Sequence, residues 1–126
     1  MKPIAPRLWP LVILEKSVVY KGGQDEALFP GLTRTANGDL LVSFCTQFDC
    51  QPGGEAYLLR STDEGRTWDR PTSIVRSQRS DGCINLSVGL TRLKDGTILY
   101  PCCDTKITRK WDQHEADLLI LRSHDH

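Results

Sequence analysis

The chain is 126 residues long, a length typical of one domain with one hydrophobic core. It carries 16 basic and 16 acidic side chains, so its formal net charge is zero, and its sequence pI is about 6.8. A balanced charge gives no electrostatic reason to expect nucleic acid or an anionic membrane surface as a partner. The composition therefore excludes both classes from the expected function.

The N-terminal residues do not look like a targeting segment. The apolar run at residues 8–14 (LWPLVIL) is interrupted by Pro10 and followed by Glu15 and Lys16. It is too short to cross a bilayer and lacks the small residues of a signal-peptide cleavage site. We expect a strand over residues 11–20 and, without an export signal, a cytoplasmic protein.

The cysteines are expected to be reduced thiols. Five are present, at Cys45, Cys50, Cys83, Cys102 and Cys103. The odd number and the absence of an export signal argue against a disulfide framework. Their spacing matches no zinc pattern. We therefore predict no metal site and no cofactor.

Two stretches of the chain repeat one another. Residues 31–41 (GLTRTANGDLL) align without gaps on residues 89–99 (GLTRLKDGTIL), 58 positions later. Residues 58–63 (LLRSTD) align on residues 120–125 (ILRSHD), 62 positions later. An internal repeat of this length indicates an architecture built from copies of one unit.

Each copy is expected to form an antiparallel meander, because Asn37-Gly38 and Asp95-Gly96 are strong hairpin signals. Strands are predicted at 31–35, 40–44, 57–60 and 72–76, and in the second copy at 89–93, 98–100 and 118–122. Residues 108–121 could also be read as an amphipathic helix, but the repeat requires a strand there. Gly31 and Gly89 open the first strands, either because two sheets crowd there or because each makes a simple turn.

The stretch 61–68 (STDEGRTW) is expected to close the turn after the third strand. Ser61 and Asp63 can accept hydrogen bonds from backbone N–H groups of the turn, and Gly65 can adopt a positive φ. Trp68 offers a flat surface for packing against a neighbouring sheet. The residues with a predicted structural role are thus Ser61, Asp63, Gly65, Thr67 and Trp68.

The pattern Ser-x-Asp-x-Gly-x-Thr-Trp resembles, at every defined position, the Asp-box or BNR repeat of the sialidase superfamily. The resemblance implies an all-β fold, a six-bladed β-propeller of which this chain holds about two four-stranded blades. Residues 1–20 would form an N-terminal strand region, 21–77 the first blade, and 78–126 a second blade that ends inside its Asp box. We expect an N-terminal fragment that has the remaining propeller blades as partners.

Candidate functional residues lie in the loops opposite the hairpin turns, at the end that carries the active site in the resembled family. These loops are expected at 21–28, 45–55, 78–85 and 102–115. Asp49 and Glu55 are the carboxylates available as a general acid/base, which a glycosidase needs. The alternative for Asp49 is a solvated loop aspartate.

The candidates for contact with a carbohydrate come from the other two loops. Asp81 and Asn85 can hydrogen-bond sugar hydroxyls, or alternatively cap a strand through a local turn. Asp104, Arg109 and Trp111 are expected in a polar and aromatic loop, where the indole could stack on a sugar face.

The resembled family binds the substrate carboxylate with three arginines, the first in an Arg-Ile-Pro motif. The matching stretch here is Leu28-Phe29-Pro30, so the arginine is absent. A bidentate Arg–carboxylate contact contributes about 1.5 to 3 kcal/mol, and its loss argues against hydrolysis of sialic acid. The expectation is a fragment of a sialidase-like glycoside hydrolase, inactive alone. The alternative is a non-catalytic propeller that binds glycan or protein.

Overall fold

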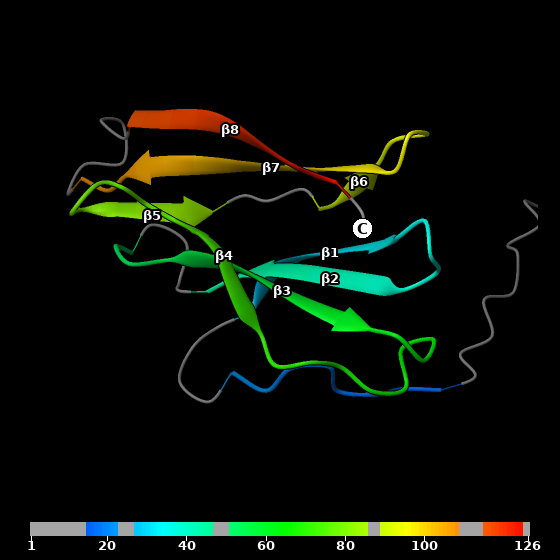
Figure 1. The fold of residues 1–126 in the computed structure, drawn as a ribbon. Helices are drawn as coiled ribbons and strands as arrows, with labels where there is room; N and C mark the ends of the chain where they lie inside the picture. The colour runs from blue at the N-terminus through cyan, green and yellow to red at the C-terminus, as the bar shows by residue number, and fades with distance from the viewer. Residues whose placement is uncertain (1–14, 23–26, 47–50, 86–88, 109–114, 125–126) are drawn as a thin grey trace, which may run out of the picture.

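The computed structural model describes residues 15–22, 27–46, 51–85, 89–108 and 115–124. Within these ranges every regular element is a strand, which confirms the all-β fold class, and all pairings are antiparallel. The strands form two sheets, which we call sheet A and sheet B (Figure 1). No helix of this part of the chain is long and apolar enough to cross a membrane.

Sheet A is the meander predicted for the first copy of the repeat. Its strands follow one another as neighbours: β1 (Leu28–Arg34), β2 (Leu40–Cys45), β3 (Glu55–Ser61) and β4 (Thr72–Arg76). The register of β1 on β2 shifts between Leu28 and Gly31, where Phe29 has a φ of 54°. A bulky residue rarely adopts this conformation, so the backbone is locally strained just before Pro30.

Sheet B contains the second copy, with β7 at its centre. Its strands are β5 (Gly82–Asn85), β6 (Thr91–Arg92), β7 (Thr97–Lys106) and β8 (Glu115–His124). β5 and β6 pair with the two ends of one edge of β7, and β8 pairs along the whole of the other edge. The strand predicted at 89–93 is reduced to β6, because Gly89 has a φ of 102° and cannot be extended.

Two sequence-based expectations about loops are wrong. Residues 102–106 continue β7 and residues 82–85 form β5, because these two segments pair with each other in sheet B. The strand predicted at 118–122 is confirmed as part of β8, in which every residue from Glu115 to His124 pairs with β7, so the helical alternative is wrong for the described part of 108–121. Residues 109–114 lie outside the described residues.

The strand expected at 11–20 is also absent over the part that the structure describes, residues 15–20. This segment lies along sheet A on the side away from sheet B (Figure 1). It contacts the sheet through Tyr20, whose ring centroid is 4.5 Å from that of Phe44. Residues 15–20 form no strand, and the side chain of Val18 is 77% exposed. The contact of Tyr20 with Phe44 therefore holds this segment against the sheet.

The two sheets pack face to face, and their contact forms the core. Cys45 and Ala56 from sheet A meet Ile84, Tyr100 and Cys102 from sheet B. At one side of this contact, Gly31 and Gly89, which occupy the same position in the two repeats, come so close that a Cβ on Gly31 would overlap the Cα of Gly89. Of the two alternatives for these glycines, the crowding of two sheets is therefore present.

Candidate functional site

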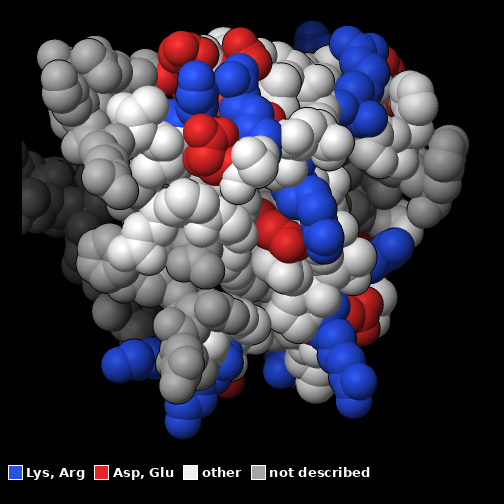
Figure 2. Space-filling view, turned by 90° about the vertical axis from the view of Figure 1, so that its left-hand side faces the viewer, with Lys and Arg blue, Asp and Glu red and all other residues white. Residues whose placement is uncertain are grey.

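The loops opposite the hairpin turns meet at one end of the two sheets, which we call the loop end. Figure 2 shows that acidic and basic side chains alternate on this end. The register places the relevant strand ends side by side: Leu28 opposite Cys45, Glu55 opposite Arg76, Gly82 opposite Lys106, and Lys106 opposite Glu115. The strand ends that flank these loops therefore lie at one end of the sheets, whereas residues 23–26, 47–50 and 109–114 of the loops lie outside the described residues.

A small polar pocket of about 130 Å³ lies at the loop end, where sheet A meets sheet B. Two backbone hydrogen bonds join the sheets beside it, from Gly53 N to Gly82 O (2.9 Å) and from Ile84 N to Gly54 O (3.0 Å). A Cβ at Gly54 would overlap Cys83 Sγ, so this close approach needs a glycine. The pocket is lined by Gly53, Gly54, Glu55, Arg76, Ser77, Arg79, Ser80 and Gly82.

Glu55, the predicted acid/base candidate, lines this pocket and is held by its neighbours on β4. Its Oε2 accepts hydrogen bonds from Ser73 Oγ (2.6 Å) and from the Arg76 guanidinium (3.3 Å). The glutamate side chain is 20% exposed, whereas that of Arg76 is 67% exposed. Glu55 therefore acts as an anchor for an arginine that projects into solvent.

Asp104 lies behind the pocket in β7, and not in a loop as expected. It is buried, and its carboxylate accepts a hydrogen bond from Ser77 Oγ (2.5 Å). Ser77 Oγ in turn accepts the Arg79 backbone N–H (3.1 Å). Asp104 thereby fixes the short connection between β4 and β5, which carries three of the pocket's polar side chains, Ser77, Arg79 and Ser80.

Arg79 links this connection to β8. Its guanidinium donates to Asp117 Oδ2 (2.5 Å) and lies 3.9 Å from Glu115 Oε2. Glu115 also pairs with Lys106 at 3.7 Å. The pKa of Arg79 is raised, chiefly by the hydrogen bond that its guanidinium donates to Asp117 and further by the negative charges of Asp117, Asp104 and Glu115. The loop end thus presents fixed charges of both signs, an arrangement suited to polar ligands rich in hydroxyl groups.

The remaining predicted site residues are placed as follows. Asp81 lies in the turn before β5, and its carbonyl accepts the Ile107 N–H (2.9 Å). Asn85 is buried in sheet B, where its Oδ1 accepts a hydrogen bond from Thr105 Oγ1 (3.1 Å). Asp49, Arg109 and Trp111 lie outside the described residues.

Sequence reasoning missed Arg76, Ser77 and Arg79. Arg76 was placed on an outer strand, and nothing in the sequence brings it to Glu55, because their proximity depends on the register of β3 and β4. Ser77 stands next to the predicted loop 78–85 and Arg79 lies within it, but their partners are 27 and 38 residues away in the chain. Only the packing of sheet A on sheet B brings these groups together.

At the opposite end, residues 61–68 form the turn after β3, which we call the Ser61–Trp68 turn. Ser61 Oγ accepts the Gly65 N–H (2.9 Å), and Asp63 Oδ1 accepts the Thr67 N–H (2.8 Å). Gly65 has a φ of 84°. These features confirm the expected mode of turn closure. The indole of Trp68 folds back onto the Ser61–Trp68 turn, where its Nε1–H donates a hydrogen bond to the Gly65 carbonyl (3.0 Å).

The cysteines show no sign of chemistry. Burial, together with Cys45 nearby, raises the pKa of the Cys102 thiol to about 11, so it stays protonated near neutral pH. Cys45, Cys83, Cys102 and Cys103, the cysteines within the described ranges, form no disulfide. Among the described residues, no group of three or more histidine, cysteine or acidic side chains is arranged to hold a metal ion.

Comparison with known proteins gives a fold likeness. No protein-family model and no curated protein matches the chain. An unknown-function protein from Dyadobacter fermentans DSM 18053 is similar in structure, with a TM-score of 0.68 and 23% identity over 86% of this chain and 35% of that one. Hadza microbial sialidase Hz136 is similar with a TM-score of 0.58 and 20% identity, over 79% of this chain and 22% of the sialidase.

Two facts follow from this comparison. The chain shares its all-β fold with part of a sialidase. A sequence identity of 20% is evidence for a similar fold only. It also spans about a third or less of the length of the two similar structures.

Proposed function

We propose that this chain supplies two neighbouring blades of a sialidase-like β-propeller that acts on glycans, with the remaining blades as its partners. The observation that carries the proposal is the Ser61–Trp68 turn. Its serine, aspartate, glycine, threonine and tryptophan all take part in turn closure, as the Asp-box motif requires. The likeness of the fold to part of a sialidase supports the same assignment.

In this proposal the glycan contacts the loop end. Arg76 and Arg79 supply hydrogen-bond donors and Glu55 supplies acceptors around a pocket of about 130 Å³. Because Glu55 and Asp104 hold these donors in place, a ligand meets groups whose positions are already fixed, which lowers the entropic cost of binding. Asp49, Asp81, Asn85, Arg109 and Trp111 remain predicted contacts of the same face.

The 126-residue chain by itself is expected not to hydrolyse sialosides. Leu28 stands in place of the first arginine of the resembled family, and both Glu55 and Asp104 accept hydrogen bonds from structural neighbours. The test is incubation with a fluorogenic sialoside at several pH values. Turnover above that of a heat-denatured sample would contradict the proposed division of the site among several blades.

A propeller that binds glycans without hydrolysis is the second candidate, favoured by the same fixed carboxylates. Binding is measured on a panel of immobilised acidic and neutral glycans. We expect Arg76→Ala to weaken binding about tenfold, because a hydrogen bond from a charged donor contributes about 1.5 to 3 kcal/mol. Arg66→Ala, at the opposite end of sheet A, serves as the control. Equal binding by wild type and both variants would rule out the loop end as the binding face.

A further inference from the structure

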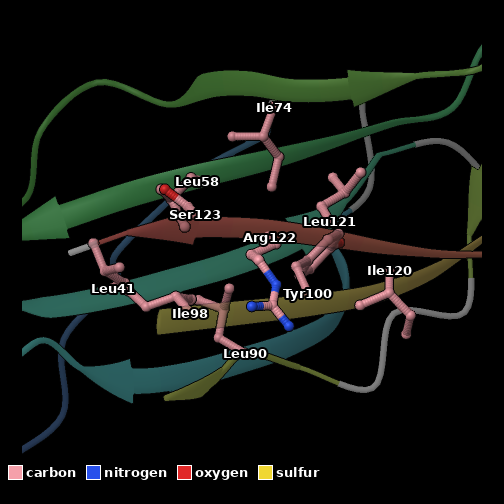
Figure 3. A pocket seen from close by; sticks show the side chains of 10 residues that line it. All are labelled: Leu41, Leu58, Ile74, Leu90, Ile98, Tyr100, Ile120, Leu121, Arg122 and Ser123. Carbon is pink, nitrogen blue, oxygen red and sulfur yellow. The ribbon is translucent and has the colours of Figure 1, made fainter. Parts of the chain in front are cut away.

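Two cavities of the molecule differ in the chemistry that they offer to a ligand. The larger one, of about 480 Å³, lies between the sheets and is lined mainly by leucine and isoleucine side chains (Figure 3). Sugar hydroxyls placed there would leave water and gain few hydrogen-bond partners. The small polar pocket at the loop end is lined instead by Glu55, two arginines, two serines and glycine backbone, all within residues 53–82. Its polar groups can replace the water that a sugar loses.

The charges around the polar pocket compensate one another. Arg76 lies 3.3 Å from the Glu55 carboxylate, and Arg79 lies 2.5 Å from that of Asp117. The charged residues of the pocket and the charged groups near them are three basic side chains, Arg76, Arg79 and Lys106, and four acidic ones, Glu55, Asp104, Glu115 and Asp117. Neither arginine therefore offers an uncompensated positive charge to a ligand.

A hydroxyl group fits between Arg76 and Glu55, because it accepts one hydrogen bond and donates another. The Arg76 side chain is 67% exposed and can donate to the hydroxyl oxygen. The Glu55 carboxylate can accept in return, since a carboxylate has about four acceptor positions and only some of them face Ser73 and Arg76. A sugar carboxylate has acceptors only, so Arg76 would attract it while Glu55 would repel it.

We propose that this pocket binds an uncharged sugar residue in preference to an acidic one, and that Glu55 sets this specificity by compensating the charge of Arg76. The inference rests on the proposed function, which brings a glycan to the loop end, and adds the class of glycan. The pocket holds about 130 Å³, less than the roughly 300 to 1,000 Å³ of sites that enclose a whole ligand, so it receives one edge of a sugar ring.

The test uses pairs of oligosaccharides that have the same length and linkage and differ only in a carboxylate. Glucose is paired with glucuronic acid, and galactose with galacturonic acid. Binding to the whole chain is measured by isothermal titration calorimetry at pH 7. We expect the neutral member to bind about fivefold more tightly, the effect of one charge at a solvated surface. Tighter binding of the acidic members would overturn this inference alone, whereas no binding of any member would overturn the proposed function as well.

Glu55→Gln identifies the residue that sets the preference. The substitution keeps the size of the side chain and leaves Arg76 without its acidic partner. The variant should bind the acidic members about fivefold more tightly than the wild type does, and the gain should disappear at about 1 M NaCl, where charges are screened. Glu64→Gln is the matched control, because it removes the acidic partner of Arg34 at the opposite end of sheet A. An unchanged preference in Glu55→Gln would overturn the role of Glu55.

Asp117→Asn examines the pocket without changing β3 or β4. The Asp117 side chain is 66% exposed, so its replacement leaves the core intact, and Arg79 loses its nearest acidic partner. We expect the preference to move toward the acidic members, as in Glu55→Gln. If the control Glu64→Gln produced an equal change, any added positive charge on the chain would suffice, and the assignment of the specificity to this pocket would be wrong.

Discussion

At the scale of single residues, the Ser61–Trp68 turn shows how one carboxylate can organise eight residues. Asp63 accepts the backbone N–H and the side-chain O–H of Thr67, and also the Ser61 hydroxyl. These bonds favour the charged carboxylate, and the two from Thr67 are the largest causes that lower the pKa of Asp63 from 3.8 to about 2. The turn therefore depends on ionisation of Asp63.

This dependence predicts a loss of stability in acid. Because the pKa of Asp63 is lower in the folded chain than in the unfolded chain, the ionised carboxylate stabilises the fold fully above about pH 4, and this stabilisation is lost as the pH falls through about 2. Asp63→Asn should lower the urea midpoint of unfolding at pH 7. Between pH 4 and pH 2, the urea midpoint of the variant should fall less than that of the wild type.

The measurement is urea denaturation followed by far-UV circular dichroism at each pH. Glu64 and Asp95 also have lowered pKa values, through Arg34 and Thr97 respectively, so some acid sensitivity should remain in the variant. The control is Asp69→Asn, which removes an exposed carboxylate just after the turn. Identical pH profiles for wild type and Asp63→Asn would show that the turn is not the acid-sensitive element.

At the scale of elements, the contact between β1 and the segment before β6 sets how closely the sheets approach. Gly31 sits in β1 directly against Gly89, with Ser43 of β2 beside it. Ser43 is fully buried, so the contact is closed to solvent. Any side chain at Gly31 must push the sheets apart, because the atoms it meets belong to the backbone of the other sheet.

We therefore predict that Gly31→Ala destabilises the fold by about 1 to 3 kcal/mol, the usual cost of overpacking a filled core. Gly38→Ala separates this steric effect from backbone strain, since Gly38 has a φ of 101° but open space around its Cα. Both are measured by chemical denaturation. If Gly31→Ala were as stable as wild type, the two sheets would be free to shift relative to each other at this point.

At the scale of the whole molecule, one cluster of buried side chains belongs to both sheets. Ile84 is fully buried between Cys45 and Ala56 of sheet A and Tyr100 and Cys102 of sheet B. Neither sheet covers this surface by itself. The two sheets should therefore fold and unfold as one unit, although the sequence presents them as two copies of a repeat.

The corresponding variant is Ile84→Ala, which should cost about 2 to 5 kcal/mol by leaving a cavity in this cluster. Hydrogen exchange should show faster opening of β2 in sheet A and of β7 in sheet B to the same extent. Val18→Ala, at an exposed position, should change stability by less than about 0.5 kcal/mol. Loss of protection in sheet B alone would mean that the sheets unfold separately.

The sequence by itself determined the elements that depend on neighbours in the chain. The turn at 61–68, the Asn37-Gly38 and Asp95-Gly96 hairpins and the four strands of sheet A follow from local backbone preferences and alternating side chains, which act over a few residues. The repeat likewise placed Gly31 and Gly89 at equivalent positions, but it left open whether crowding or a simple turn requires a glycine there.

Tertiary structure alone decided the rest. The extension of β7 to Lys106 and the formation of β5 depend on each other, because each segment is a strand only when it has the other as a partner. The same holds for the loop end, where Arg76 meets Glu55 and Arg79 meets Asp117 across sheet registers. Pairings between distant segments depend on how whole sheets pack, and no local pattern in the chain encodes that.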